Sequence, residues 1–243
     1  MLSSITDLTS SGRSRYDGLN IVYRRRMTWH VSANISYVLS RALSYRGYAA
    51  SYSNAPSNVT AYLAPYDFGP TPSDERHRFV VSGVIDLPWG IRFSPIMQIA
   101  SARPYTPVEG TDYFGYGTSG TSEQAVMLNS DPKNYLATAS YTAAQINSCL
   151  SAGNCHISNY DSARGLAFFQ FDARFSKMVK IREKASIEFM FQAFDMTNRA
   201  NFGGNYYNNI RSSSFGTPAG FITPSAVVMP QFFAGEAGFT FRF

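Results

Sequence analysis

The chain lacks a run of apolar residues long enough to form a membrane-spanning helix. Such a helix needs about 18 consecutive residues with few or no charges, and no apolar stretch in the 243-residue sequence reaches that length. A transmembrane β-barrel is not excluded, because its strands cross the bilayer with about 9 to 11 residues of alternating polarity. The missing run therefore excludes one kind of membrane protein and leaves the other open.

Charged residues are also scarce, since they make up only 15% of the chain, and the net charge is +5. The positive charge is spread along the sequence except at Arg24-Arg25-Arg26, whereas nucleic-acid-binding proteins gather it on one patch or stripe. We expect no nucleic-acid partner.

Cysteine is nearly absent as well: the two that occur, Cys149 and Cys155, lie in the stretch CLSAGNC. Ser, Gly and Asn between them favour a turn that brings the thiols together, and a small disulfide loop suits an oxidising compartment. The alternative is a metal site that also uses His156, but this set is one ligand short of tetrahedral zinc. We expect a disulfide and no metal.

Phe and Tyr, by contrast, are abundant, and apolar and polar residues alternate in most segments. In WHVSANISYVL the odd-numbered residues from Trp29 to Leu39 are apolar, and the even-numbered ones from His30 to Ser36 are polar. A period of two is typical of a β-strand with two unlike faces. The same pattern recurs in RFVVSGVIDL, GIRFSPIMQIA, FFQFDARFS, SIEFMFQAF and the final GEAGFTFRF, with a weaker first strand around YDGLNIVYR.

The connections between these strands alternate between short and long. Short ones are expected near 25–28, 87–90 and 179–184, and long ones near 41–75, 103–165 and 197–230. Short periplasmic turns and long external loops are typical of an outer-membrane barrel. If the carboxyl end is periplasmic, Trp29 and Trp89 lie at periplasmic turns, where an interfacial aromatic belt belongs.

The sequence therefore predicts an all-β fold, a transmembrane antiparallel β-barrel with about seven strands and long external loops. An odd number of strands leaves two unpaired edges, which are costly in a membrane. The start MLSSITDLTSSGRSR has no apolar core of a signal peptide. We therefore expect 1–243 to be a single domain, the carboxyl-terminal segment of a larger barrel, with 1–14 as an external lead-in or partial strand.

Several segments resemble the carboxyl-terminal part of TonB-dependent outer-membrane receptors of the Oar-like group. The resemblance covers most of the chain from about residue 15 and rests on short motifs in the same order: YDGLNIVYRRR with SYVLSRAL, DERHRFVVSGVIDLPWG, SARPYTP, FDARFSK, FQAFDMTNRANFG and FTFRF. It implies a 22-stranded barrel whose lumen is closed by an N-terminal plug domain, with transport powered through TonB. The plug and the TonB box have no counterpart in the sequence. The resemblance also implies that Phe239, Phe241 and Phe243 form the signal read by the barrel assembly machinery.

Two groups of side chains are candidates for contact with a solute. Polar residues of the strands would line the lumen, where mutual compensation of their charges is the simpler interpretation; these are Arg78, Asp86, Arg92, Asp172, Arg174, Glu188, Glu236 and Arg242. External-loop tyrosines suit recognition of glycans or peptides, although they could instead pack the loops together; the candidates are Tyr48, Tyr52, Tyr66, Tyr113 and Tyr116.

No catalytic arrangement emerges, because His30, His77 and His156 fall in segments expected at opposite ends of the barrel. We expect no enzymatic activity and no cofactor. The leading interpretation is a barrel portion of a TonB-dependent receptor in the bacterial outer membrane, with membrane lipid, the assembly machinery, a plug, TonB and an unknown external ligand as partners. The alternatives are a small self-contained outer-membrane barrel, adhesive or structural, and a soluble carbohydrate-binding β-sandwich.

Overall fold

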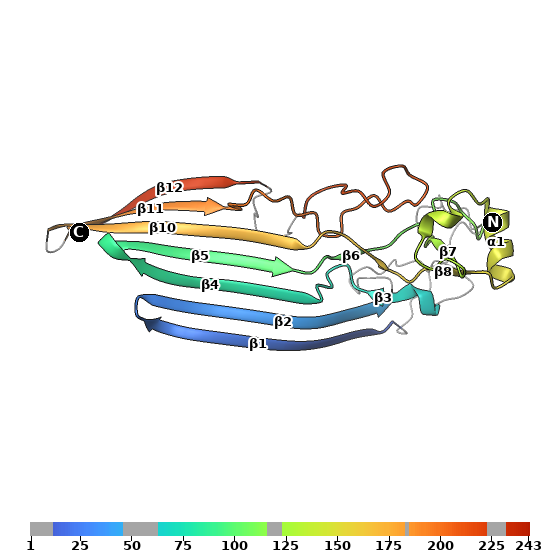
Figure 1. Cartoon of the computed structure of the whole chain (residues 1–243), viewed down its shortest axis with the longest axis horizontal. Coiled ribbons are helices and arrows are strands. Elements are labelled where there is room, and N and C mark those ends of the chain that lie inside the picture. The colour runs from blue at the N-terminus through green and yellow to red at the C-terminus, as the bar shows by residue number, and fades with distance from the viewer. Residues whose placement is uncertain (1–11, 46–62, 116–122, 183–184, 223–231) are drawn as a thin grey trace, which may run out of the picture.

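The computed structural model describes residues 12–45, 63–115, 123–182, 185–222 and 232–243. Long strands dominate these residues (Figure 1). They are β1 (Ser14–Thr28), β2 (Val31–Tyr45), β4 (His77–Leu87), β5 (Ile91–Ala100), β10 (Phe168–Arg182), β11 (Ala185–Phe194) and β12 (Ala234–Arg242). Each strand predicted from the alternation of polarity corresponds to one of them.

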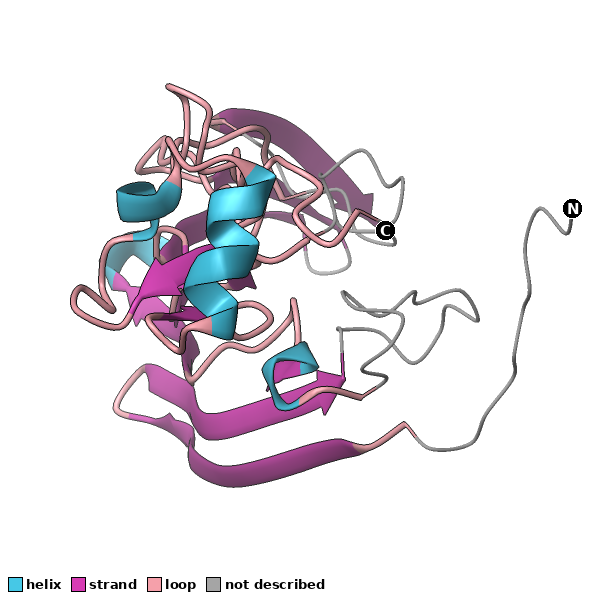
Figure 2. Ribbon diagram, turned by 90° about the vertical axis from the view of Figure 1, so that its right-hand side faces the viewer, coloured by secondary structure: helices cyan, strands magenta, loops and turns pink. Residues whose placement is uncertain are grey.

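These strands form one antiparallel sheet in the order β1-β2-β4-β5-β10-β11-β12, and the short β3 (Phe68–Pro70) pairs with β2. Sequence neighbours are therefore also spatial neighbours among the long strands. Seen from the loop end, the strands follow an open arc (Figure 2). Within the described residues, β1 and β12 are the two edges of the sheet, and they do not pair with each other.

The register gives the sheet one apolar face and one polar face. Partners among the long strands have residue numbers of the same parity, except at the register shifts beside the turns (Thr28 with Val31 and Arg182 with Ala185): Tyr23 lies opposite Ile35, and Phe189 lies opposite both Lys177 and Phe239. Side chains point alternately to the two faces of a strand, so the odd-numbered residues share one face between those shifts. That face carries most of the Phe, Ile, Leu and Val side chains of the strands, whereas the even-numbered face carries most of the Ser, Asn, Gln and charged ones.

The large side chains of the apolar face are exposed. Phe239 is 72% exposed, Phe189 52% and Phe241 49%. In a soluble β-sandwich the inner faces of two sheets cover each other, and no described element covers these rings. The soluble-sandwich alternative is therefore wrong for this fold.

Tight turns and the carboxyl terminus lie at one end of the sheet, and the long connections lie at the other (Figure 1). The β4–β5 turn is the short helix η2 (Pro88–Gly90), within the predicted range. The first turn was misplaced, because β1 continues to Thr28 and the turn is formed by Trp29 and His30. Both residues have positive φ, 55° and 64°, as a two-residue turn of the mirror-image type requires. Such turns usually contain Gly or Asn, so the sequence at Trp29 and His30 does not indicate one.

The described loop segments 63–76, 101–115, 123–167 and 195–222 fold together at the loop end, and we call them the loop body (Figure 2). Its remaining elements are small: η1 (Pro65–Asp67), β6 (Pro104–Tyr105), β7 (Val126–Leu128), η3 (Tyr135–Thr138), α1 (Ala143–Ser151), β8 (Cys155–Ile157) and β9 (Ala163–Arg164). Strand β6 pairs with β9, and β7 pairs with β8.

Helix α1 begins with a reciprocal pair of hydrogen bonds. The Thr142 hydroxyl accepts from the Gln145 N–H, and the Gln145 side chain accepts from the Thr142 N–H, which satisfies two donors that the first helical turn leaves free. The helix buries Ile146 in the loop body. Among the described residues, no helix is both long and apolar enough to cross a membrane.

Candidate functional site

The polar face is covered at its loop end. Four even-numbered strand residues there are buried, namely Ser44, Ala100, Phe168 and Gln170, whereas the even-numbered Met178, near the short-turn end of β10, is 45% exposed. The loop body therefore lies over the outer part of the polar face. A solute that enters along this face would meet the loop body first.

At the short-turn end, two ion pairs on the polar face join neighbouring strands. Arg92 Nε donates to Asp86 Oδ1 at 2.8 Å between β5 and β4. Arg242 Nη2 donates to Glu188 Oε2 at 3.1 Å between β12 and β11. Opposite charges on adjacent strands compensate one another, as expected for the lining of an aqueous lumen.

At the loop end, ion pairs join the sheet to the loop body. Glu75 accepts from Arg78 at 2.6 Å through one oxygen and from Arg103 at 2.8 Å through the other. Asp74, which is 1% exposed, accepts from the Ala42 N–H and from Arg164 Nη2, both at 2.8 Å. These contacts fix how the loop body sits on β2 and β4.

The remaining predicted lumen residues also lie on the polar face. Asp172 accepts from Gln170 Nε2 and from the Asp195 N–H, and Glu236 accepts from Gln192 Nε2. Arg174 Nη2 lies 3.2 Å from the sulfur of Met190. The eight predicted residues therefore share one face of the sheet, but they are spread along it and do not form a single binding site.

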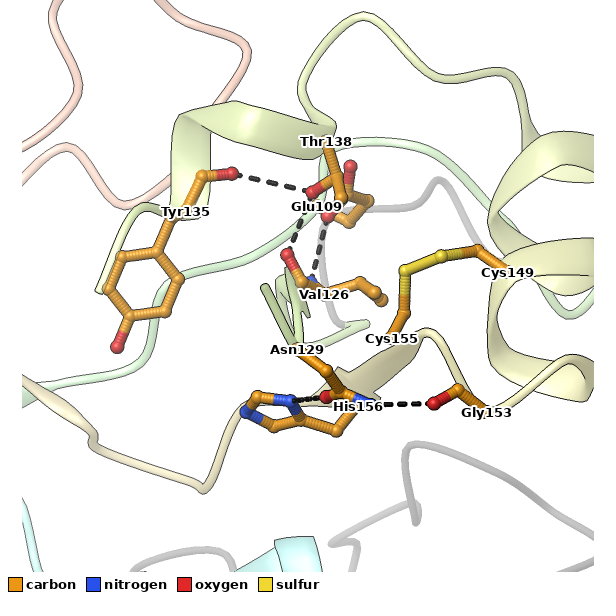
Figure 3. The surroundings of a disulfide bond; sticks show 9 residues. All are labelled: Glu109, Val126, Asn129, Tyr135, Thr138, Cys149, Gly153, Cys155 and His156. Carbon is orange, nitrogen blue, oxygen red and sulfur yellow. Dashed lines mark hydrogen bonds between the residues drawn. A yellow bond between two sulfur atoms is a disulfide. The ribbon is translucent and has the colours of Figure 1, made fainter. Parts of the chain in front are cut away.

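The loop body has a small apolar core of its own. Tyr113, Val126, Ile146 and Cys155 form its buried cluster, and Figure 3 shows the surroundings of the disulfide there. The predicted pair Cys149 and Cys155 forms this disulfide, with the two Cα atoms 5.4 Å apart. It ties the last turn of α1 to the first residue of β8.

A buried ion pair connects two loops that are distant in sequence. Glu109 is fully buried, and its carboxylate accepts from the Val126 N–H at 2.9 Å and from Arg211 Nη2 at 3.1 Å. Arg211 also donates to the carbonyl oxygens of Glu109, Ala139 and Tyr141. Arg211 therefore holds the connection after β11 against the connection after β5.

Burial raises the pKa of several carboxyls in the loop body. Desolvation raises the pKa of Glu109 to about 7, although the Val126 N–H and Arg211 act in the opposite direction. Desolvation also raises the pKa of Glu123 to about 7, against the hydrogen bond from the Tyr113 N–H, and the pKa of Asp161 to about 6, against that from Thr106. Burial in the loop body therefore favours the neutral form of these carboxyls.

One of the predicted ligand-binding tyrosines is a core residue. Tyr113 is 1% exposed, and its hydroxyl donates to the Gln124 carbonyl at 2.9 Å, so its ring packs the loop body and cannot face a ligand. Tyr66 is half-buried, and its carbonyl oxygen accepts from the Tyr160 N–H and the Gln124 side chain. Tyr48, Tyr52 and Tyr116 lie outside the described residues.

The three histidines lie in different parts of the molecule: His30 in the β1–β2 turn, His77 at the start of β4 and His156 in β8. In the described part of the chain, no group of three or more His, Cys, Asp or Glu side chains could hold a metal ion. His156 Nδ1 lies 2.7 Å from Asn129 Oδ1 on the surface of the loop body (Figure 3), whereas His77 lies 2.8 Å from the Tyr37 hydroxyl at the start of β4.

Sequence reasoning missed the ion pair with the least exposed side chains among the described residues. Glu109 and Arg211 are separated by 102 positions, and neither belongs to a motif or to an alternating strand. The sequence shows only that each residue lies in a long connection, and that both connections are expected at the same end of the sheet.

A curved antiparallel sheet with an exposed apolar face, a polar face that carries most of the charged residues of the strands and long loops at one end defines an outer-membrane β-barrel protein. A family model described as an outer membrane beta barrel domain matches residues 1–226, so the chain belongs to that family. No curated protein and no solved structure matched the chain. The protein is located in the bacterial outer membrane, and its apolar face contacts membrane lipid.

Proposed function

We propose that the chain forms part of the wall of a TonB-dependent receptor that takes a solute across the outer membrane. The polar face is the lining of the conduit, and the loop body covers its outer end. The observation that carries this proposal is the burial of Ser44, Ala100 and Gln170 under the loop body, on the same face as the compensated charges. An external solute would be captured by the loops before it reaches the lining.

The two edges of the sheet support a larger barrel. Successive long strands are antiparallel, so β1 and β12 both run from the loop end to the short-turn end. A direct β1–β12 seam would therefore pair parallel strands, which all-antiparallel barrels do not contain. Each edge instead needs a strand that runs in the opposite direction, and the resemblance to the 22-stranded receptors implies where such strands come from.

In the full receptor, the partners would be a plug inside the lumen and TonB for energy coupling. The carboxyl-terminal Phe239, Phe241 and Phe243 would contact the barrel assembly machinery. Phe239 and Phe241 lie on the apolar face, and the ring of Phe243, which is 96% exposed, stacks on that of Phe241. We also propose that the protein performs no catalysis and carries no cofactor.

Uptake measurements test this function. Cells that carry the protein and cells that lack it would be compared for uptake of a ferric siderophore, cobalamin and a maltooligosaccharide, with and without TonB. We expect uptake of at least one solute that requires both the protein and TonB. Uptake of none, or uptake that continues without TonB, would contradict the proposal and favour a self-contained adhesive or structural barrel.

A further inference from the structure

Three arginines lie close together at the loop end of β1 and β2, and we call them the outer arginines: Arg13, Arg15 and Arg41. All three are exposed. Arg41 lies opposite Asp17, which follows Arg15 on the same face of β1. Arg13 directly precedes β1, and its carbonyl accepts from the Tyr45 N–H, which continues the same register. The outer arginines therefore lie on adjacent strands and share the odd-numbered, apolar face.

The outer arginines lie where the apolar band of the sheet ends. On β2 the odd-numbered residues from Val31 to Leu39 are uncharged, and the next one is Arg41. Val31 and Arg41 are separated by about 33 Å along the strand, or about 25 Å along the membrane normal at the usual strand tilt of about 40°. The apolar band of an outer-membrane barrel has a height of about 25 Å. The outer arginines are therefore expected at the level of the lipid headgroups, on the side of the external loops.

An aromatic pair on the same face marks this boundary. Phe68 of β3 lies opposite Tyr45, and the two ring centroids are 5.0 Å apart. Tyrosine beside arginine is typical of the interface between the hydrocarbon and the headgroups, where both side chains act as anchors. The level inferred from the length of the apolar band therefore agrees with the residue types found there.

The outer arginines carry more positive charge than their neighbours compensate. Asp17 accepts from Arg15 through Nε at 2.8 Å and through Nη2 at 3.3 Å. Within the described residues, no ion pair involves Arg13 or Arg41. The arginines that join the sheet and the loop body differ, because each pairs with a carboxylate: Arg78, Arg103, Arg164 and Arg211. Two guanidinium groups at the lipid boundary are thus available to an anion from outside the chain.

We propose that the outer arginines bind the phosphate groups of lipid A, the acylated and phosphorylated anchor of lipopolysaccharide in the outer leaflet. A guanidinium group stays charged and offers a phosphate two parallel hydrogen bonds. The acyl chains of the same molecule contact the adjoining apolar band, where Leu19 is 54% and Leu39 37% exposed. A soluble phosphate or an acidic protein would leave these apolar side chains uncovered, so the surface fits a lipid better.

Binding of lipid A does not depend on whether the barrel takes up a solute, so the uptake assay and the lipid assay can fail separately. The lipid assay uses the purified full chain in a neutral detergent and native mass spectrometry. Bisphosphorylated lipid A, its dephosphorylated form and phosphatidylglycerol are titrated in turn, and the retained lipid is measured. We expect the bisphosphorylated form to bind most tightly, with an affinity that falls as salt is added.

Neutralising the two unpaired arginines should remove this selectivity. Each basic residue near an anionic surface contributes about fivefold to the affinity, so R13Q/R41Q should bind bisphosphorylated lipid A about 25-fold more weakly. Its affinity for the dephosphorylated form should not change. D17N frees Arg15 from its carboxylate and should strengthen the binding of the bisphosphorylated form.

Two matched variants complete the test. R13K/R41K keeps the charge and should lose much less affinity than R13Q/R41Q. R24Q/K180Q removes two exposed positive charges from the polar face, where Arg24 lies opposite Asn34 and Lys180 opposite Ser186, and should leave the affinity unchanged.

Three results would each overturn the proposal: equal binding of the two forms of lipid A, equal losses in R13Q/R41Q and R24Q/K180Q, or tighter binding of phosphatidylglycerol than of bisphosphorylated lipid A. The comparison of the two forms of lipid A uses the unmodified protein, so it gives a result even if a variant does not fold.

Discussion

The sheet and the loop body bury different kinds of side chain. The sheet exposes its large apolar residues, such as Phe189 and Phe239, and keeps few of them buried. The loop body buries Tyr113, Val126 and Ile146 in a core closed by a disulfide, and it also buries charge, as Glu109 shows. The sheet is therefore suited to a solvent of lipid chains, whereas the loop body is organised like a small soluble protein.

This difference predicts opposite responses to the same kind of mutation. A polar substitution on the apolar face should act through the membrane, and its effect should depend on the bilayer. A substitution in the loop body should act through packing and hydrogen bonds, with little dependence on lipid. The variants below test that distinction, from the largest expected effect to the smallest.

Replacing Arg211 should have the largest effect, and it should be confined to the loop body. Removing one partner of a buried ion pair costs about 3 to 5 kcal/mol, and Arg211→Met also removes donors to three carbonyl oxygens. Hydrogen exchange of the Val126 amide, which bonds Glu109, measures the loss directly. Lys133→Met, at an exposed position of the loop body, is the control.

The same variant should depend on pH. The folded pKa of Glu109 is raised, to about 7 from 4.5, so its contribution to stability is fully present below 4.5 and is lost as pH rises through 7. Arg211 stabilises the ionised form, so the variant should lose more stability at pH 8 than at pH 5. An equal loss of stability at pH 5 and pH 8 would show that ionisation of Glu109 does not contribute to the effect of the substitution.

A charge on the apolar face should have the next largest effect, and it should act on the sheet. Phe175 lies on the apolar face of β10 opposite Phe93, and an arginine on the lipid-facing side costs up to about 2 to 4 kcal/mol, depending on its depth in the bilayer. Phe175→Arg should therefore lower the free energy of unfolding in lipid vesicles, measured by urea titration. Ile96→Arg is the matched control, because Ile96 lies on the polar face opposite Asp172; an equal loss there would mean that the faces are misassigned.

Removal of the disulfide should destabilise the loop body more modestly. Cross-linking a loop of this size, with a sequence separation of six, contributes about 2 kcal/mol by the chain-entropy estimate. Cys149→Ser/Cys155→Ser should increase proteolysis within the loop body and leave the sheet intact. A thiol titration of the native protein should find no free thiol, and two reactive thiols would contradict the structure.

The smallest effect is expected from a pair on the polar face. Arg242 and Glu188 form a partly exposed ion pair, and such pairs contribute about 0 to 1 kcal/mol. Arg242→Gln should therefore change the urea midpoint in vesicles only slightly. A loss as large as that of Phe175→Arg would show that the polar face is dry, and the conduit interpretation would then be wrong.

The sheet could be predicted from sequence far better than the loop body. A period of two is a local signal, so β2, β4, β5, β10 and β11 could be recognised one strand at a time. The disulfide was also accessible, because only two cysteines occur and they lie close together. Turn positions were less certain, since Trp29 and His30 adopt positive φ without the Gly or Asn that usually indicates it.

The loop body depends on contacts between distant residues, which composition does not reveal. Tyr113 was predicted to face a ligand because tyrosine is common at binding surfaces. It is instead a core residue, whose N–H donates to the Glu123 carboxylate and whose hydroxyl donates to the Gln124 carbonyl. Glu109 and Arg211 carried no recognisable motif. Sequence periodicity therefore identified the part of the molecule that contacts lipid and missed the part that organises the loops.

A nitroxide scan along residues 169–179 of β10 in lipid vesicles tests most directly whether lipid covers the apolar face. Collisions with oxygen, which concentrates in hydrocarbon, and with a water-soluble nickel complex would be measured at each position. We predict oxygen maxima at the odd-numbered residues Phe171, Phe175 and Val179 and nickel maxima at the even-numbered Ser176 and Met178, which lie beyond the loop body. Odd-numbered positions closed to both reagents, as inside a packed protein core, would contradict the account.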